Sequence, residues 1–256
     1  MRWTPMLLSS VTALTAVALP VAADGPEPPV ARVDLSEHVP ARWLDDRTDA
    51  MPLTPDRWRR RMPAECQTRG GYRDHCQGNF IAPTPHGAAQ ALATELALGH
   101  RATAMLLMHD RPLPEWIEAV EDADAAERLL FPVPNGHLGR GFGHTRTGSM
   151  SHRMHRGVDI GGIPEGSPIL AARGGLVAYA GNELTGYGNV VILLHHEGFS
   201  TFYAHCRALR VFAGQRVERG EVVAEVGMTG FAPAPHLHFE WRQRGWPRDP
   251  APQFDR

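Results

Sequence analysis

The sequence predicts a mainly β protein in which a small helical segment precedes a compact antiparallel β-sheet domain. Glycine and proline become frequent after Leu130, and turn signals such as Gly174-Gly175 and Glu197-Gly198 separate short apolar runs. Six of these runs are rich in strand-forming residues: SPILAA, LVAYAG, NVVILLHH, STFYAH, EVVAEVG and LHFEWR. Short strands between turn signals are typical of an antiparallel β domain, which we place at residues 131–256.

The length and charge of the chain limit the other possibilities. With 256 residues, the chain can form one well-buried domain and a smaller appendage. Its formal net charge is -2, so no overall positive field indicates a nucleic-acid partner or attraction to an anionic membrane. We therefore expect no nucleic-acid partner.

Residues 1–23 have the features of a signal peptide. Arg2 precedes an apolar run from about Met6 to Leu19, and the small-residue sequence VAA suits cleavage after Ala23. The apolar run is short for a membrane span and contains two serines and two threonines. We expect an exported protein, periplasmic or secreted, without stable membrane insertion. An uncleaved membrane anchor is the alternative.

The next segment, residues 24–84, is rich in proline and arginine and lacks sustained periodicity, so we expect it to be mostly irregular. In an oxidising compartment, Cys66 and Cys76 could close a short loop within it. That pairing leaves Cys206 as an odd thiol, which we expect to be a small, buried apolar side chain.

Residues 85–130 have helical periodicity. Apolar side chains recur every three or four residues before and after Gly99, and a third candidate helix starts at Pro114. Two short helices joined at a glycine also fit a DNA-binding helix-turn-helix, but the export signal favours simple packing. The three predicted apolar faces consist of Ala88, Leu92 and Leu96; Ala102, Met105 and Leu106; and Trp116, Val120, Ala123 and Leu130.

Histidines in the predicted sheet are the candidates for chemistry. In PHLHFEWR, His236 and His238 project from one face of the strand and Leu237 from the other, because side chains alternate along a strand. Glu240 shares the histidine face but lies about 7 Å further along. We therefore expect Glu240 to contact a metal ligand rather than to be one.

Two further motifs supply possible partners. His155 and Asp159 lie four residues apart in HRGVD, and a loop bent at the glycine could join an imidazole and a carboxylate in part of a zinc shell. In TFYAHC, alternation puts Tyr203 and His205 on one face and Cys206 on the other. Cys206 should therefore not bind a metal together with His205.

From Phe131 to the C-terminus, the chain resembles the LytM/lysostaphin-type zinc metallopeptidases of peptidase family M23. The matching segments, in the family's order, are FPVPNGHLGRGFG, HRGVDIGGIPEGSPILAARGGLVAYAG, GYGNVVILLHHEGFSTFYAH, GQRVERGEVVAEVGMTG and PHLHFEWR. The resemblance implies an antiparallel sheet of the LytM, or duplicated-hybrid-motif, type. The chain departs from the family at Cys206, where leucine is frequent, and at Ala234, where glycine is common.

The resemblance also implies a role for each site residue. His155, Asp159 and His238 take the positions of the three zinc ligands. His205 and His236 take the positions of two catalytic histidines that do not bind the metal, and the resemblance does not say which is the general base. The implied activity is that of a zinc metalloendopeptidase that hydrolyses peptide bonds in peptidoglycan stem peptides or cross-links. The export signal supports this substrate independently.

Three alternatives remain. Relatives that lack zinc ligands act as non-catalytic activators or binding partners of cell-wall hydrolases, but all five polar positions are present here. A phosphohistidine carrier has a similar β architecture, but an export signal and a carboxylate ligand argue against it. A latent enzyme would have its Pro/Arg-rich segment over the groove. Near the first motif, Arg146, Arg153 and Arg156 are either solvated or partners of substrate carboxylates.

Overall fold

The computed structural model describes residues 33–44, 81–109, 111–118, 120, 128–144, 154–184 and 186–255. The predicted signal peptide, Cys66, Cys76, Arg146 and Arg153 lie outside these ranges. Within them, no helix combines the length and the apolar character needed to cross a membrane.

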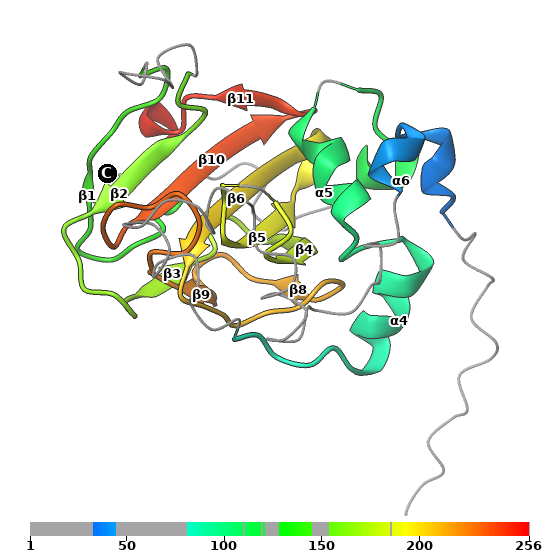
Figure 1. Ribbon diagram of the computed structural model, residues 1–256, viewed down its shortest axis with the longest axis horizontal. Helices are drawn as coiled ribbons and strands as arrows, with labels where there is room; N and C mark the ends of the chain where they lie inside the picture. The colour runs from blue at the N-terminus through cyan, green and yellow to red at the C-terminus, as the bar shows by residue number, and fades with distance from the viewer. Residues whose placement is uncertain are drawn as a thin grey trace, which may run out of the picture. The chain divides into compact units, whose positions relative to one another are not determined.

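The larger of two sheets has eight strands, and each pair of neighbours is antiparallel (Figure 1). Strand β10 lies inside this sheet between β2 and β6, and six of its seven residues are buried. The order of the sheet is β1 (His137–Leu138), β2 (Val158–Gly161), β10 (Leu237–Gln243), β6 (Phe199–Cys206), β5 (Asn189–Leu194), β4 (Gly175–Gly181) and β8 (Arg216–Val217), and β11 (Trp246–Arg248) pairs with β10.

A smaller antiparallel sheet contains β3 (Pro168–Leu170), β9 (Val222–Glu225) and β7 (Ala208–Leu209). Apolar side chains from both sheets form a first hydrophobic cluster, to which Ile169 and Phe239 both belong. Each of the six runs identified in the sequence contains one strand: β3, β4, β5, β6, β9 or β10. The prediction of a mainly antiparallel β-fold is therefore confirmed.

The helical segment contains α4 (Gly87–Glu95), α5 (Arg101–Met108) and the short α6 (Glu115–Glu118). The first two helices lie on either side of Gly99, as the periodicity predicts. Four 3₁₀ turns complete the described secondary structure: η1 (Leu35–Glu37), η2 (Ala41–Trp43), η4 (His196–Gly198) and η5 (Ala251–Gln253).

The third predicted helix is wrong at Val120 and at residues 128–130, and its remaining part after Glu118 lies outside the described residues. Val120 has no regular secondary structure, and Leu129 forms a β-bridge with Phe254. The amide of Leu129 donates to the Gln253 carbonyl, and its own carbonyl accepts from the Asp255 amide. Pairing with the C-terminal segment thus satisfies the backbone near Leu129, and this tertiary contact overrides the helical spacing of the sequence.

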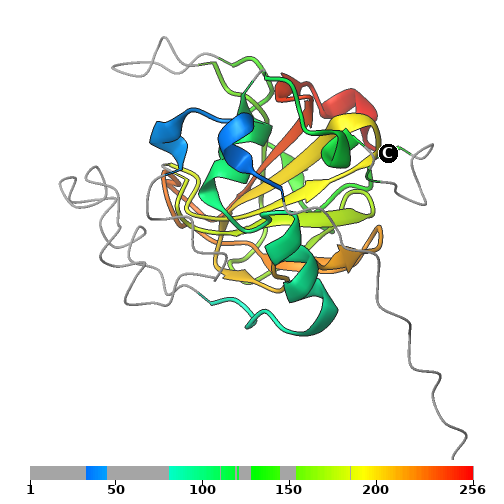
Figure 2. The ribbon, with the colours of Figure 1, turned by 90° about the vertical axis from the view of Figure 1, so that its right-hand side faces the viewer.

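The helices pack on the face of the larger sheet that points away from the smaller sheet (Figure 2). Side chains of this face, including Ile192 and Phe202, form a second hydrophobic cluster with Leu98, Leu106 and Leu107. Helix α5 contacts β4. On β10, Leu237, Phe239 and Trp241 belong to the first cluster, so alternation places His238, Glu240 and Arg242 on the helix-covered face.

Candidate metal centre

Strand pairing creates the centre. In the register of β2 with β10, Asp159 lies directly opposite His238. The strands approach closely at Gly157, where an added Cβ atom would lie 2.1 Å from the Phe239 carbonyl oxygen. Any larger residue at position 157 would push β2 away from β10, so the glycine between His155 and Asp159 allows the two motifs to meet.

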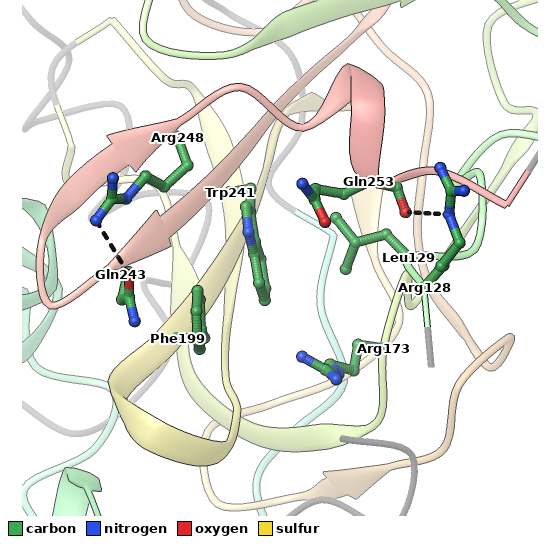
Figure 3. Close-up of a pocket in the computed structure, with 8 residues that line it drawn as sticks. All are labelled: Arg128, Leu129, Arg173, Phe199, Trp241, Gln243, Arg248 and Gln253. Carbon is green, nitrogen blue, oxygen red and sulfur yellow. Dashed lines mark hydrogen bonds between the residues drawn. The ribbon is translucent and has the colours of Figure 1, made fainter. Parts of the chain in front are cut away.

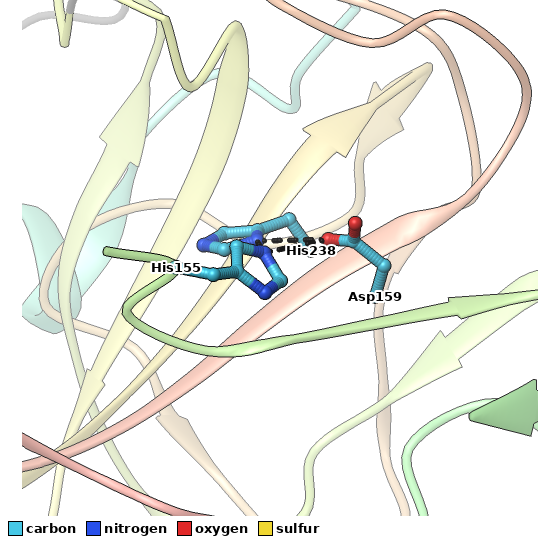
Figure 4. A group of neighbouring side chains, drawn as sticks. All are labelled: His155, Asp159 and His238. Atoms are coloured by element: carbon cyan, nitrogen blue, oxygen red, sulfur yellow. Dashed lines mark hydrogen bonds and ion pairs between the residues drawn. The ribbon is translucent and has the colours of Figure 1, made fainter. Parts of the chain in front are cut away.

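One donor atom from each of the three predicted ligands faces the others (Figure 4). Nε2 of His155 is 3.0 Å from Oδ1 of Asp159 and 3.0 Å from Nδ1 of His238. Nδ1 of His238 is 3.1 Å from the same carboxylate oxygen. Tetrahedral zinc, with bonds of about 2.0–2.2 Å, needs donor atoms about 3.3–3.6 Å apart. A small outward shift of the three side chains would therefore satisfy its geometry.

In each ligand histidine, the hydrogen-bond partner of the outer nitrogen, the one that points away from Asp159, decides which ring nitrogen carries hydrogen. Nδ1 of His155 is 2.9 Å from the Gly141 carbonyl oxygen, and Nε2 of His238 is 3.0 Å from Oε1 of Glu240. Carbonyl and carboxylate oxygens only accept hydrogen bonds, so these two nitrogens carry the hydrogens. The inner nitrogens then present lone pairs to one another and to Asp159. This arrangement is repulsive without a cation or a proton between the groups, and imidazole with carboxylate is a donor set that zinc accepts.

The close contacts among these residues also shift the pKa values of Asp159 and His238. Burial raises the pKa of Asp159, but the adjacent His155 and His238 rings, which donate to the carboxylate when protonated, outweigh burial and hold it well below its usual value. Burial lowers the pKa of His238, but hydrogen bonds to Asp159 and Glu240 raise it to about 9. Without a metal, the centre thus attracts a proton. The same negative potential favours binding of a cation.

His205 reaches the centre through an irregularity in β6. Asn189 and Val191 are two residues apart in β5, but they pair with Cys206 and Tyr203, which are three apart in β6. The extra residue makes a β-bulge, and His205 there has a φ of 65°. This uncommon conformation is held in place by its surroundings, and it sets the His205 and His238 rings 5.8 Å apart between centroids.

The bulge contradicts the prediction that Tyr203 and His205 share a face. Tyr203 and Cys206 both belong to the first hydrophobic cluster, whereas His205 points to the centre on the opposite face. Alternation holds only for a regular strand, and the extra residue shifts it by one position. Cys206 does lie away from His205, as expected. It is fully buried, and burial raises the pKa of its thiol.

His236 lies next to the centre, immediately before β10. Its Nε2 is 3.6 Å from Oδ1 of Asp159, and its ring centroid is 4.8 Å from that of His205. Nδ1 of His236 is 2.7 Å from the Ala234 carbonyl oxygen, and Nδ1 of His205 is 2.8 Å from that of Thr229. Both Nδ1 atoms therefore carry hydrogens, and each Nε2 has a lone pair. Burial lowers both pKa values, so both rings are neutral at pH 7 and can accept a proton.

A buried polar network continues behind His238. Oε1 of Glu240 contacts His238 and also accepts a hydrogen bond from the Tyr187 hydroxyl at 2.8 Å. Oε2 of Glu240 accepts from Nε of Arg242 at 2.6 Å. The expectation that Glu240 contacts a ligand agrees with this geometry. Sequence reasoning missed Arg242 and Tyr187. Strand alternation beyond Glu240 indicates Arg242, whereas no pattern in the sequence indicates Tyr187.

A cavity of about 340 Å³ lies beside the centre, lined in part by Asp159, His236 and Arg140. Nη1 of Arg140 is 3.7 Å from Oδ2 of Asp159, and the Arg140 side chain is 37% exposed. This cation at the cavity was not identified from the sequence. Of the three arginines noted there, Arg156 is within the described residues and is exposed.

A second cavity, of about 390 Å³, lies on the other face of β10 (Figure 3). Phe199 and Trp241 line it with stacked rings whose centroids are 4.5 Å apart. Trp241 points away from the face of Glu240 and Arg242, so this cavity is separate from the histidine cluster.

Comparison with known proteins gives a family match over the histidine motifs. Residues 153–250 match the sequence profile described as "Peptidase family M23". The matched range includes all five predicted site residues: His155, Asp159, His205, His236 and His238.

The relatives include proteins with different printed functions. "Lipoprotein NlpD/LppB homolog" of Pseudomonas aeruginosa is 42% identical over 125 residues, which is 46% of this chain and 41% of that protein. "DD-carboxypeptidase/endopeptidase Mpg" of Neisseria meningitidis serogroup B is 41% identical over 98 residues, 38% of this chain and 22% of that protein. "Murein hydrolase activator NlpD" of Escherichia coli is 41% identical over 91 residues, 36% of this chain and 24% of that protein. The chain thus matches less than half the length of each of these relatives.

Proposed function

We propose that this chain, whose residues 153–250 belong to peptidase family M23, is a zinc-dependent endopeptidase that hydrolyses peptide bonds in peptidoglycan stem peptides or cross-links. One observation carries the proposal. Donor atoms of His155, Asp159 and His238 lie 3.0–3.1 Å apart with their lone pairs facing one another, and two neutral histidines lie beside them. Three protein ligands with an open fourth position are typical of hydrolytic zinc sites.

The two remaining histidines have different tasks in this proposal. A zinc ion at the centre would polarise the scissile carbonyl and lower the pKa of a water molecule from about 15.7 to about 7. His236 lines the cavity, so its Nε2 accepts the proton of the attacking water and returns it to the leaving amine. Nδ1–H of His205 is bonded to Thr229, so its Nε2 acts as an acceptor that orients the water.

Peptidoglycan is the proposed substrate for three reasons. Relatives carry the printed names endopeptidase and murein hydrolase activator, and the N-terminal sequence favours export to the compartment where this polymer lies. The third reason is Arg140. Its guanidinium lines the cavity beside the centre, where it could bind a carboxylate of a stem peptide.

A non-catalytic activator is the second candidate, because one relative carries that printed name. The complete set of two histidines and a carboxylate, with two further histidines, favours catalysis over activation. A protein that only binds has no need for three lone pairs held against one another.

The deciding experiment uses purified protein and purified peptidoglycan. Zinc content is measured by elemental analysis, and released peptides are measured by mass spectrometry with and without a chelator, for the wild type and for His236→Ala. The endopeptidase proposal expects about one zinc per chain and new peptide termini that disappear with chelator or with the variant. Absence of products from the zinc-loaded wild type, together with stimulation of an added murein hydrolase, would support the activator instead.

A further hypothesis from the sequence is that residues 24–84 keep the enzyme inactive. Its test needs a deletion that leaves the packing of the sheet intact. Removal of everything before Leu129 would expose the apolar side chains that the sheet shares with α4 and α5. The 33–44 segment also contributes buried side chains to this cluster, Leu35, Val39 and Trp43. Replacing only residues 45–80 with a Gly/Ser linker keeps both segments. Higher peptide release by this variant supports latency, and an unchanged rate contradicts it.

A further inference from the structure

The metal ligand His238 is connected to the helical segment by an unbroken series of hydrogen bonds that are buried up to Arg242 and partly buried at Met108. Nε2 of His238 is 3.0 Å from Oε1 of Glu240, and Oε2 of Glu240 is 2.6 Å from Nε of Arg242. Nη1 of Arg242 donates to the carbonyl of Met108, the last residue of α5, at 2.9 Å. It also donates to the carbonyl of Gly245 in the turn between β10 and β11, at 2.8 Å. The series thus reaches from the centre to α5.

This ion pair is costly to bury. Glu240 and Arg242 are each 1% exposed, and the Arg242 guanidinium lies 5.0 Å from the centre of the Phe202 ring. Taking a carboxylate and a guanidinium out of water is strongly unfavourable, and apolar side chains of similar size often stabilise a fold as well or better. Stability alone therefore does not account for the pair. The cost of burying Glu240 with Arg242 is offset if a neighbouring group needs a fixed negative charge beside it.

That group is the imidazole of His238. The outer nitrogens of His155, His205 and His236 are held by neutral backbone carbonyls, whereas that of His238 is held by a carboxylate. A carboxylate accepts only, so it keeps the hydrogen on Nε2 and leaves the lone pair on Nδ1, directed at Asp159 and His155. Such a partner fixes the tautomer and the ring orientation and makes the ligand a better donor.

Tyr187 supports the same carboxylate from a second direction. Its hydroxyl donates to Oε1 of Glu240 at 2.8 Å, and its backbone carbonyl accepts from the amide of His205 at 2.9 Å. The Tyr187 and His238 rings meet edge to face with centroids 6.0 Å apart. One residue therefore contacts Glu240, the ring of a ligand and the backbone of a second site histidine.

We propose that Glu240 is a positioning residue that selects Nδ1 of His238 as the metal-binding nitrogen, and that Arg242 holds Glu240 in register with helix α5. The helical segment is then a structural part of the metal centre, because the Met108 carbonyl fixes the guanidinium that fixes the carboxylate. The inference rests on the metal site of the proposed function. The orientation of His238, however, can be measured without any metal.

The test compares Glu240→Gln with Glu225→Gln, a matched control at the surface pair of Glu225 with Arg210. Zinc affinity is measured by competition with a chromophoric chelator. In the metal-free proteins, at a pH above the His238 pKa of about 9 where its ring is neutral, ¹⁵N chemical shifts report which nitrogen of His238 carries hydrogen. We expect the wild type and Glu225→Gln to hold hydrogen on Nε2. We expect Glu240→Gln to show mixed tautomers and about 10–100-fold weaker zinc binding.

Two further variants keep the proposal testable if Glu240→Gln does not fold. Tyr187→Phe removes one hydrogen bond to Glu240 and should weaken zinc binding by a few-fold. Arg242→Lys keeps the positive charge but cannot form the same planar set of bonds, and it should shift the visible spectrum of the cobalt-substituted protein. Wild-type affinity, tautomer and spectrum in the folded variants would overturn the proposal. A wild type that holds Nε2–H but binds no zinc would instead count against the proposed function.

Discussion

The two faces of strand β10 differ in chemical character: one is polar and the other is apolar. One face presents His238, Glu240 and Arg242, each paired with a polar partner. The other presents Leu237 and Phe239, which are fully buried among apolar side chains, and Trp241, which lines the second cavity. Both faces are buried, so burial alone does not separate the site from the core.

The difference lies in what each face requires. On the apolar face, contact area and shape determine stability, and side chains of similar volume can replace one another at modest cost. On the polar face, each group needs a partner of the right charge and direction, because an unpaired buried polar group costs free energy. We therefore expect substitutions on the polar face to change metal binding and catalysis, and those on the apolar face to change mainly the free energy of unfolding.

The largest expected effect comes from His238→Ala. This change removes a ligand and leaves the Glu240 carboxylate without its imidazole partner. We expect loss of bound zinc and a fall in peptidoglycan cleavage of more than about 10³-fold. Elemental analysis and peptide release measure the two effects, with His196→Ala as a control at an exposed histidine. Zinc retention at the wild-type level by His238→Ala would show that another residue is the third ligand.

His236→Ala should separate binding from turnover. His236 lines the cavity, but its Nδ1 is held by the Ala234 carbonyl and it is not one of the three clustered donors. We expect full zinc content and a fall in kcat of about 10²–10⁴-fold, the usual contribution of a general base. Steady-state kinetics on a defined stem peptide would measure this. A zinc-free variant would contradict the division of roles between His236 and His238.

Phe239→Ala tests the apolar face of the same strand. Phe239 is fully buried and packs against the rings of Tyr203 and Phe254. We expect a loss of about 3–5 kcal/mol in the free energy of unfolding, measured with urea, and unchanged zinc content in the folded fraction. Trp246→Ala, at a residue 55% exposed, is the control and should cost little. A selective loss of zinc from folded Phe239→Ala would show that the two faces are not independent.

The smallest expected effect is that of Arg140→Ala. Its partly exposed guanidinium contributes only a screened interaction with a substrate carboxylate. We expect KM to rise by about 3–10-fold with kcat nearly unchanged, because the contact is made equally before and during the reaction. Kinetics on stem peptides with a free or an amidated carboxylate would measure this, and Arg216→Ala in β8 is the control. Equal KM values for the two peptides with the wild type would remove Arg140 from substrate binding.

The sequence alone determined the fold class and brought the five site residues together as a hypothesis. Dense turn signals and short apolar runs are local properties, so each predicted run contains a strand. The placement of His238 and Glu240 on one face follows from the two-residue period of a strand, which holds in β10.

Only the tertiary structure decided the rest. The bulge that turns His205 toward the centre depends on pairing between β5 and β6, and the non-helical backbone at Leu129 depends on its pairing with Phe254. The choice of Nδ1 in His238 depends on Glu240, and the anchor of Arg242 at Met108 joins residues 134 positions apart. Periodicity in a sequence reports the local backbone, whereas partners and tautomers are set by contacts between distant segments.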